Sequence, residues 1–270
     1  MTESDWVSDL AGLLTLEMLD RDLYRGRNPD YGDRSALFGG QVAAQALMAA
    51  GSTVDGDRVV HSLHGYFLRP GLTDRPVILR VERDRDGRSF SARHVAAVQD
   101  GAVIFSMLCS FALEQPADTI EDLRHRDAPS PEGLPVSAMT NLVDIREVTL
   151  NQSDLGVYTD CFWARSIVSL GDDPLVHAAG LTYVSDFGTG FGQYDHPTLA
   201  RAGASLDHAM WFHEPIRADE WLLTELRPIK ARAGRGLYEG SMRDEKGRLG
   251  ATIQQELLLR RHPPPPKQAR

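Results

Sequence analysis

The chain has 270 residues, of which 42% are hydrophobic, a composition typical of a folded globular protein with one large domain or two of ordinary size. Its 38 acidic residues outnumber its 29 basic residues, for a formal net charge of −9. This balance argues against a protein that coats nucleic acid or an anionic membrane. No apolar segment reaches membrane-spanning length, and the first residues are acidic where a signal peptide would be basic. We therefore expect a cytoplasmic protein with no nucleic-acid partner and no membrane insertion.

Two helices are predicted near the start of the chain. Apolar residues at helical spacing predict a short amphipathic helix within residues 5–26. Residues 38–51 open with Gly39 and Gly40 and carry alanines on one face, which predicts a buried helix that a sheet can approach closely. The two glycines leave backbone N–H groups bare at the positive end of the helix dipole, where a carbonyl oxygen or an anion could bind.

Four strands follow the second helix. Turn residues separate them, including the hairpin signals Asp86-Gly87 and Asp100-Gly101. The predicted strands cover residues 61–68, 76–83, 89–98 and 102–111. One helix followed by four antiparallel strands predicts a sheet that curls around that helix.

The second half of the chain repeats this order. Residues 116–140 are rich in Pro, Asp, Glu and Arg, which predicts a linker between halves at 1–115 and 141–262. Asp173 and Pro174 predict the start of another helix. Extended segments are predicted at 143–148 and 160–167, and strands at 205–213, 221–226, 236–243 and 248–259. An offset of about 145 residues superposes the two halves, and the proline-rich residues 263–270 are predicted to be a disordered tail.

Four runs in this order, at residues 38–42, 61–71, 86–93 and 206–213, resemble the acyl-CoA thioesterase II family. The resemblance implies an α+β double hot-dog fold, with two helix-wrapped antiparallel sheets joined in one chain. It also implies hydrolysis of fatty acyl-CoA thioesters to free acid and CoA, and so a role in lipid metabolism. A bound water attacks, with no metal, covalent intermediate or cofactor, coenzyme A being part of the substrate. We also expect a homo-oligomer.

The resemblance implies three water-holding residues, of which this chain supplies two. The Asp position falls on Asp207 and the Gln position on Gln255. The family's Ser or Thr position falls on Ile229, which offers no hydrogen bond. A carboxylate beside an amide is the smallest set of side chains that we expect for hydrolysis. The carboxylate takes a proton from the attacking water, and the amide orients that water. Without the resemblance, an Asp at a strand start is more often a cap or turn former.

An oxyanion also forms when water attacks a thioester, and it needs hydrogen-bond donors. We predict that these are backbone N–H groups near Gly39, Gly40 or Gln41, with Gly40 as the central one. The second helix, near Leu175, is the other possibility.

Other polar residues could contact the substrate. His64 and Tyr66 lie on the strand equivalent to the one that bears Asp207, and either line the acyl channel or pack in the core with satisfied hydrogen bonds. Lys230 and Arg232 are predicted to bind the CoA phosphates, unless they are solvated strand ends. The further cations weighed for that role are Arg69, Arg93 and Arg235.

Cysteine and histidine usage predicts neither a disulfide nor a metal site. Cys109 and Cys161 lie far apart within apolar segments, which suits buried, reduced thiols. Two histidine pairs have spacings that a metal could use, but neither has a third ligand in a matching position. These pairs are His61 with His64 and His208 with His213.

Two other functions stay open at this point. An acyl-CoA binding or regulatory protein could share the fold and have lost hydrolysis together with the hydroxyl at Ile229. A hot-dog hydratase is the other, although no Asp/His pair has a hydratase-like spacing.

Overall fold

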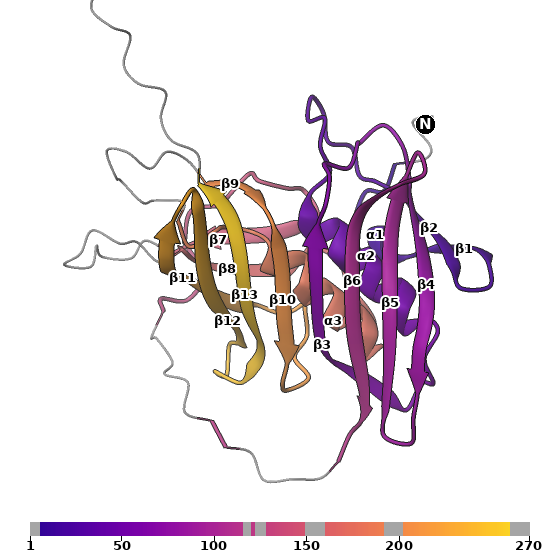
Figure 1. Ribbon diagram of the computed structural model, residues 1–270. Coiled ribbons are helices and arrows are strands. Elements are labelled where there is room, and N and C mark those ends of the chain that lie inside the picture. Colours follow the sequence, from indigo (N-terminus) through magenta and orange to yellow (C-terminus); the bar gives the residue numbers. More distant parts are fainter. Residues whose placement is uncertain (1–5, 116–119, 122–127, 149–159, 192–201, 260–270) are drawn as a thin grey trace, which may run out of the picture.

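The computed structural model describes residues 6–115, 120–121, 128–148, 160–191 and 202–259. Within these ranges three α-helices accompany one 13-stranded sheet, and every named strand pair in it is antiparallel. Figure 1 shows the helices gathered on one face of the sheet. The predicted tail and residues 116–119 and 122–127 of the predicted linker lie outside the described residues, so the domain boundaries stay a prediction.

The first half follows the predicted order, with one correction. Its elements are α1 (Leu10–Leu14), β1 (Glu17–Asp20), β2 (Leu23–Gly26), α2 (Gly39–Gly51), β3 (Arg58–Phe67), β4 (Val77–Asp86), β5 (Phe90–Gln99) and β6 (Ala102–Leu113). The buried helix and the four strands are confirmed. The helix predicted within residues 5–26 is wrong beyond α1, because Leu23–Gly26 pairs with β4 and Asp22 turns the chain at a φ of 58°. Tertiary pairing overrides the helical spacing there.

The second half is also confirmed in order. Its elements are β7 (Val143–Glu147), β8 (Asp160–Ser166), α3 (Pro174–Ser185), β9 (Ala202–Ser205), β10 (Asp207–Phe212), β11 (Leu222–Arg232), β12 (Arg235–Asp244) and β13 (Leu249–Leu259). Asp173 caps α3 as predicted, since its carboxylate accepts a hydrogen bond from Leu175 N at 2.9 Å.

The two halves share a strand order that mirrors across the middle of the sheet. The order runs β1-β2-β4-β5-β6-β3-β10-β13-β12-β11-β8-β7, with β9 paired to β13. From the centre outward, β3, β6, β5 and β4 therefore correspond to β10, β13, β12 and β11. The halves join where β3 and β10 pair, with Tyr66 opposite Asp207 and Leu63 opposite Met210.

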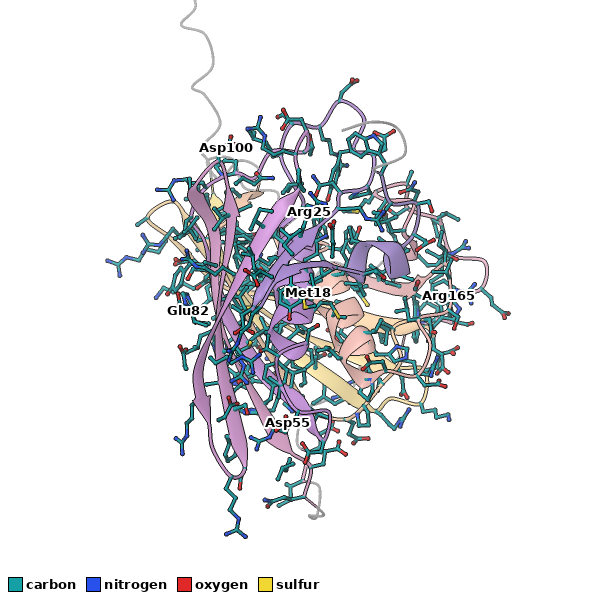
Figure 2. All side chains as sticks on the ribbon, turned by 90° about the vertical axis from the view of Figure 1, so that its right-hand side faces the viewer. Met18, Arg25, Asp55, Glu82, Asp100 and Arg165 are labelled. Carbon is teal, nitrogen blue, oxygen red and sulfur yellow. The ribbon has the colours of Figure 1, made fainter. Side chains whose placement is uncertain are left out.

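Small residues bring the helices close to each other and to the sheet. The alanines predicted to line α2 are fully buried, and α2 packs against α3. A Cβ on Gly51, the last residue of α2, would lie 2.4 Å from the Leu175 side chain. In the side view of Figure 2, strands of the first half are seen almost edge-on, with helices on one side and Glu82 toward the other.

Cys109 and Cys161 are both buried, as predicted, and no disulfide joins them. Of the helices within the described ranges, none is long and apolar enough to cross a lipid bilayer. The same ranges hold no group of three or more His, Cys, Asp or Glu side chains that could bind a metal ion.

Candidate active site

The start of α2 receives a carboxylate from the other half of the molecule. Phe38, the residue before the helix, makes no side-chain capping bond. Instead Gly40 N donates to Asp186 Oδ2 at 2.8 Å, and Asp186 is the residue that ends α3. A Cβ on Gly39 would lie 2.7 Å from the same carboxylate oxygen. Glycine is therefore needed here to let the carboxylate reach the positive end of the helix.

Gln255 binds the same carboxylate from the sheet. Its side chain is 1% exposed on β13, and its Nε2 donates to Asp186 Oδ1 at 2.9 Å and to Ser205 Oγ at 2.5 Å. Its Oε1 accepts a hydrogen bond from Nδ1 of the buried His208. A buried amide that is held on both sides is fixed in orientation, because any rotation would leave polar atoms unpaired.

The second ring nitrogen of His208, Nε2, also has a hydrogen-bond partner. This nitrogen lies 2.8 Å from Ser185 Oγ, and that hydroxyl donates to Thr182 O at 2.8 Å. The end of α3 thus supports both the histidine and the carboxylate that meet at Gln255. We call Ser185, Asp186, Ser205, His208 and Gln255 the amide cluster.

Burial raises the pKa of Asp186 above its ordinary value. The charge of His208 and hydrogen bonds from Gln255, Gly40 and Ser205 oppose this effect without cancelling it. A carboxylate with a raised pKa is a stronger base than an exposed one, which is a property of groups that take protons from water.

Asp207 lies beside the amide cluster but makes a different contact. Its carboxylate Oδ1 accepts a hydrogen bond from Glu256 N at 2.6 Å, where the chain passes from β9 to β10. No hydrogen bond joins Asp207 to Gln255 among the described residues; the carboxylate bonded to Gln255 is Asp186. This bond reaches a residue 49 positions along the chain and is not the local cap or turn that an isolated Asp suggests. The catalytic role of Asp207 stays a prediction.

The predicted oxyanion donor is occupied in the free chain. Gly40 N donates to Asp186, so binding of an oxyanion by Gly40 requires Asp186 to release it. The alternative at the start of α3 differs, because Asp173 of the same half caps that helix. That helix start faces a cavity of about 620 Å³ at the end of α2 remote from Asp186. Its apolar lining includes Met48, Val60, Phe111, Leu175 and Leu181.

His64 and Tyr66 are exposed, on the face of β3 opposite the buried Leu63. The His64 ring packs edge-on against Trp211, with the ring centroids 5.0 Å apart. The alternative role of buried core packing is wrong for both residues, because they lie on the outer face. Their contact with substrate stays a prediction.

Ile229 lies at a bulge in β11. The pairing with β12 shifts between Pro228 and Lys230, and the Ile229 side chain is 47% exposed. A hydrogen-bonding side chain is therefore missing from β11 at this point, as the sequence predicts.

The candidate phosphate-binding cations fall into two groups. Lys230 and Arg232 are exposed at the end of β11, as phosphate contact requires. Arg235 is paired with Glu256 at 2.9 Å, and Arg69 donates to Val103 O at 2.7 Å.

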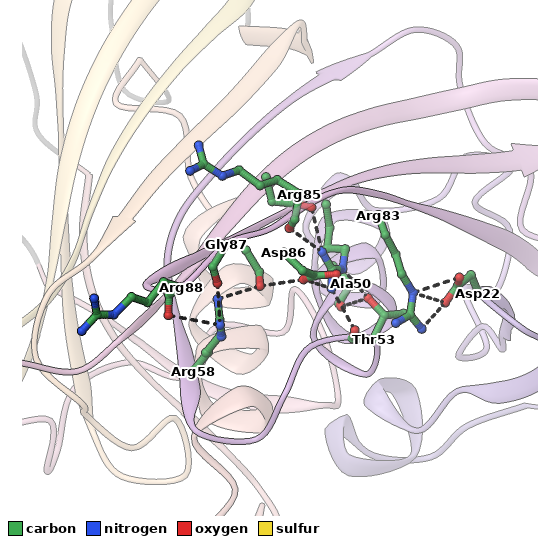
Figure 3. A network of polar contacts seen from close by, with 12 residues as sticks. Asp22, Ala50, Thr53, Arg58, Arg83, Arg85, Asp86, Gly87 and Arg88 are labelled. Atoms are coloured by element: carbon green, nitrogen blue, oxygen red, sulfur yellow. Dashed lines mark hydrogen bonds and ion pairs between the residues drawn. The ribbon is translucent and has the colours of Figure 1, made fainter.

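The prediction that Arg93 could bind phosphate is wrong, because the residue is 1% exposed and its guanidinium is hydrogen-bonded within the protein. Its guanidinium donates to Thr53 Oγ1 at 2.7 Å and to Thr53 O at 3.0 Å, just beyond α2. It also donates to Asp86 Oδ1 at 2.7 Å and to Arg85 O at 3.0 Å. Figure 3 shows this network linking the end of α2 to β4 and the hairpin after it. Arg93 therefore has a structural role.

Asp186 and Ser205 were not predicted as site residues, and His208 was considered only as part of a histidine pair. One signal was present at Asp186. A carboxylate at the C-terminal end of a helix faces the negative end of the helix dipole, which is unfavourable unless a partner elsewhere compensates. The partner here is the start of α2.

Known proteins match this chain along almost its whole length. Residues 28–112 match the model of the acyl-CoA thioesterase N-terminal domain, and residues 121–259 match that of the C-terminal domain. Acyl-coenzyme A thioesterase 8 of Mus musculus is 36% identical, over 93% of this chain and 88% of the mouse protein.

Solved structures agree. An acyl-CoA thioesterase II from Mycobacterium marinum is 39% identical, with a TM-score of 0.81 over 97% of this chain and 99% of that one. A hot-dog protein of unknown function from Alicyclobacillus acidocaldarius, 20% identical, has a TM-score of 0.77 over 97% of this chain and 100% of its own, and supports the fold alone. The fold is that of the hot-dog thioesterases, and the chain belongs to the acyl-CoA thioesterase family.

Proposed function

We propose that this protein hydrolyses acyl-CoA thioesters to free acid and CoA, with water as the nucleophile. Family membership supports the substrate class. The observation that carries the proposal is Gln255, a buried amide fixed at the start of a helix next to two carboxylates, Asp186 and Asp207. We also propose the finer fold, a double hot-dog in which each half wraps its sheet around its helix, on the mirrored strand order.

The proposed reaction needs a base, a water orienter and oxyanion donors. Asp207 takes a proton from the attacking water. Gln255 orients that water through the second lone pair of Oε1, since His208 occupies the first. The first N–H groups of a helix have no partner within it, so those of Gly39 and Gln41 stabilise the oxyanion while Gly40 holds Asp186. Attack forms the C–O bond, and collapse of the intermediate breaks the C–S bond and releases CoA thiolate.

The substrate's CoA part is anionic, and this chain is acidic overall. Lys230 and Arg232 are the exposed cations proposed to bind its phosphates. His64 and Tyr66 remain candidates for contact with the rest of the substrate. We also propose a cytoplasmic location and a homo-oligomer.

A second candidate function rests on Ile229. Because the side chain there cannot bind water, the protein could bind acyl-CoA in a regulatory role with weak or no hydrolysis. The test measures free CoA release from acyl-CoAs of short to long chain length, with calorimetric binding of the same compounds. Release at saturating substrate supports hydrolysis, whereas tight binding without release supports the regulatory role. Loss of enoyl-CoA absorbance without CoA release identifies a hydratase.

A further inference from the structure

Two hydroxyl groups within the described residues are buried without a hydrogen-bond partner, on Thr224 and Tyr238. Tyr238 is 0% exposed. A buried hydroxyl that makes no hydrogen bond loses its contacts with water and gains nothing in return. A phenol that only filled space in the core could be replaced by phenylalanine at no cost, so packing alone does not explain the hydroxyl of Tyr238.

Tyr238 is directly joined to the amide cluster through the sheet. It lies on β12 opposite Gln255 of β13 and opposite Pro228 of β11. Residues directly opposite each other in an antiparallel pair project from the same face, with Cβ atoms roughly 5 Å apart. Since Tyr238 and Gln255 are both buried, they share the inner face of the sheet.

The phenol also lies within the field of three carboxylates. Burial raises the pKa of Tyr238, and the charges of Asp186, Asp160 and Asp207 raise it further, in that order. The hydroxyl therefore stays protonated through the neutral range and is available as a hydrogen-bond donor. Asp160 is itself occupied, because its Oδ2 accepts from the N–H groups of Thr189 and Gly190 at 2.9 Å each.

The position of Tyr238 coincides with the place where β11 lacks a hydroxyl. Pro228, its partner across the strands, begins the bulge that contains Ile229. At this point β11 offers no hydroxyl donor, whereas the next strand, β12, carries the hydroxyl of Tyr238. Tyr238 lies directly opposite Gln255.

We propose that Tyr238 is a further catalytic residue, whose hydroxyl donates a hydrogen bond to the attacking water at the amide cluster. This inference rests on the proposed hydrolysis. In the free chain the hydroxyl has no described partner, and with acyl-CoA and water bound it gains one. Tyr238 thus takes the place of the side chain that is missing at Ile229.

The test compares Tyr238→Phe with Thr224→Val. Each substitution removes one unpartnered buried hydroxyl and keeps the shape of the side chain. Thr224 lies four residues from Pro228 along β11, opposite Met242, which is roughly 13 Å from the bulge at strand spacing. The measurements are kcat and KM for CoA release and the melting temperature of each variant.

The expected result is a fall in kcat of at least about tenfold for Tyr238→Phe, with KM within about threefold. Its melting temperature should be unchanged or higher, because an unpaired buried hydroxyl is removed. Thr224→Val should keep the wild-type kcat. Three results overturn the inference: wild-type kcat in Tyr238→Phe, a clearly lower melting temperature that reveals a structural partner, or an equal loss of kcat in Thr224→Val. If the wild-type protein releases no CoA, the proposed function fails as well, whereas wild-type turnover with full activity in Tyr238→Phe refutes only the role of Tyr238.

Discussion

Asp207 offers a substitution that separates its structural contact from its proposed chemistry. Its Oδ1 accepts a hydrogen bond from Glu256 N at 2.6 Å, and the side chain is half-buried. Asparagine keeps an oxygen acceptor at this position but loses the charge and the basicity. Alanine loses both the acceptor and the charge. The pair Asp207→Asn and Asp207→Ala therefore distinguishes a structural contact with the Glu256 backbone from a general base.

The two variants should differ in how much they lower the free energy of unfolding. Asp207→Ala leaves the Glu256 N–H without its acceptor, at a cost of about 1–3 kcal/mol in the free energy of unfolding. Asp207→Asn should stay within about 0.5 kcal/mol of wild type, since the hydrogen bond survives. Both variants should lose at least about a hundredfold in kcat, because general-base steps typically contribute that much.

The assay is steady-state release of CoA, with calorimetric unfolding of the same preparations. We expect KM to change little, since the substitution acts on the attacking water rather than on substrate binding. Wild-type kcat in Asp207→Asn, together with lower stability in Asp207→Ala, would show that Asp207 only makes a structural contact. The reacting carboxylate would then have to be Asp186, which already contacts Gln255.

Three other predictions concern stability, the missing hydroxyl and the thiols. Arg93→Met should lower the free energy of unfolding by on the order of 3 kcal/mol, measured by denaturant titration, because a buried guanidinium and its hydrogen bonds are lost; a change below about 1 kcal/mol contradicts the structural role. Ile229→Thr should leave kcat within about twofold, because Tyr238 already supplies a donor; a gain of about fivefold at unchanged melting temperature, which corresponds to one recovered hydrogen bond of about 1 kcal/mol, would show that the centre is a weakened form of the family's. The thiols of Cys109 and Cys161 should resist a thiol reagent at pH 8 until the protein is unfolded, because both are buried and burial raises the pKa of Cys109 to about 12; fast labelling of the native protein contradicts this.

The order of elements could be predicted because its signals are local. Hairpin turns show this clearly, since Asp100 and Gly101 both adopt the positive φ that their dipeptide predicts, at 48° and 74°. The helix predicted within residues 5–26 failed for the opposite reason. Leu23–Gly26 forms a strand because β4 is available beside it, and that partner is more than fifty residues away in the sequence.

The site was only partly predictable, because its contacts join distant segments. The resemblance pointed to Asp207 and Gln255, but Gln255 binds Asp186, which is 69 positions earlier in the chain. Nothing in the local sequence around either residue indicates that pairing. Arg93 was misread for a similar reason, since an arginine in a strand is usually solvated, and its partner Thr53 lies 40 positions away. Each of these contacts joins a strand to the end of a helix, so it exists only once the helices have packed on the sheet.

The most direct test of the role of Gln255 is CoA release by Gln255→Leu at saturating acyl-CoA, beside wild type and with binding of the same substrate measured by calorimetry. Leucine keeps most of the side-chain volume but removes the amide that joins Asp186, Ser205 and His208. We expect that wild type turns over, that the variant loses at least about tenfold in kcat, and that substrate affinity is largely kept. A variant with the wild-type rate would place the reacting water elsewhere and contradict the central role of Gln255.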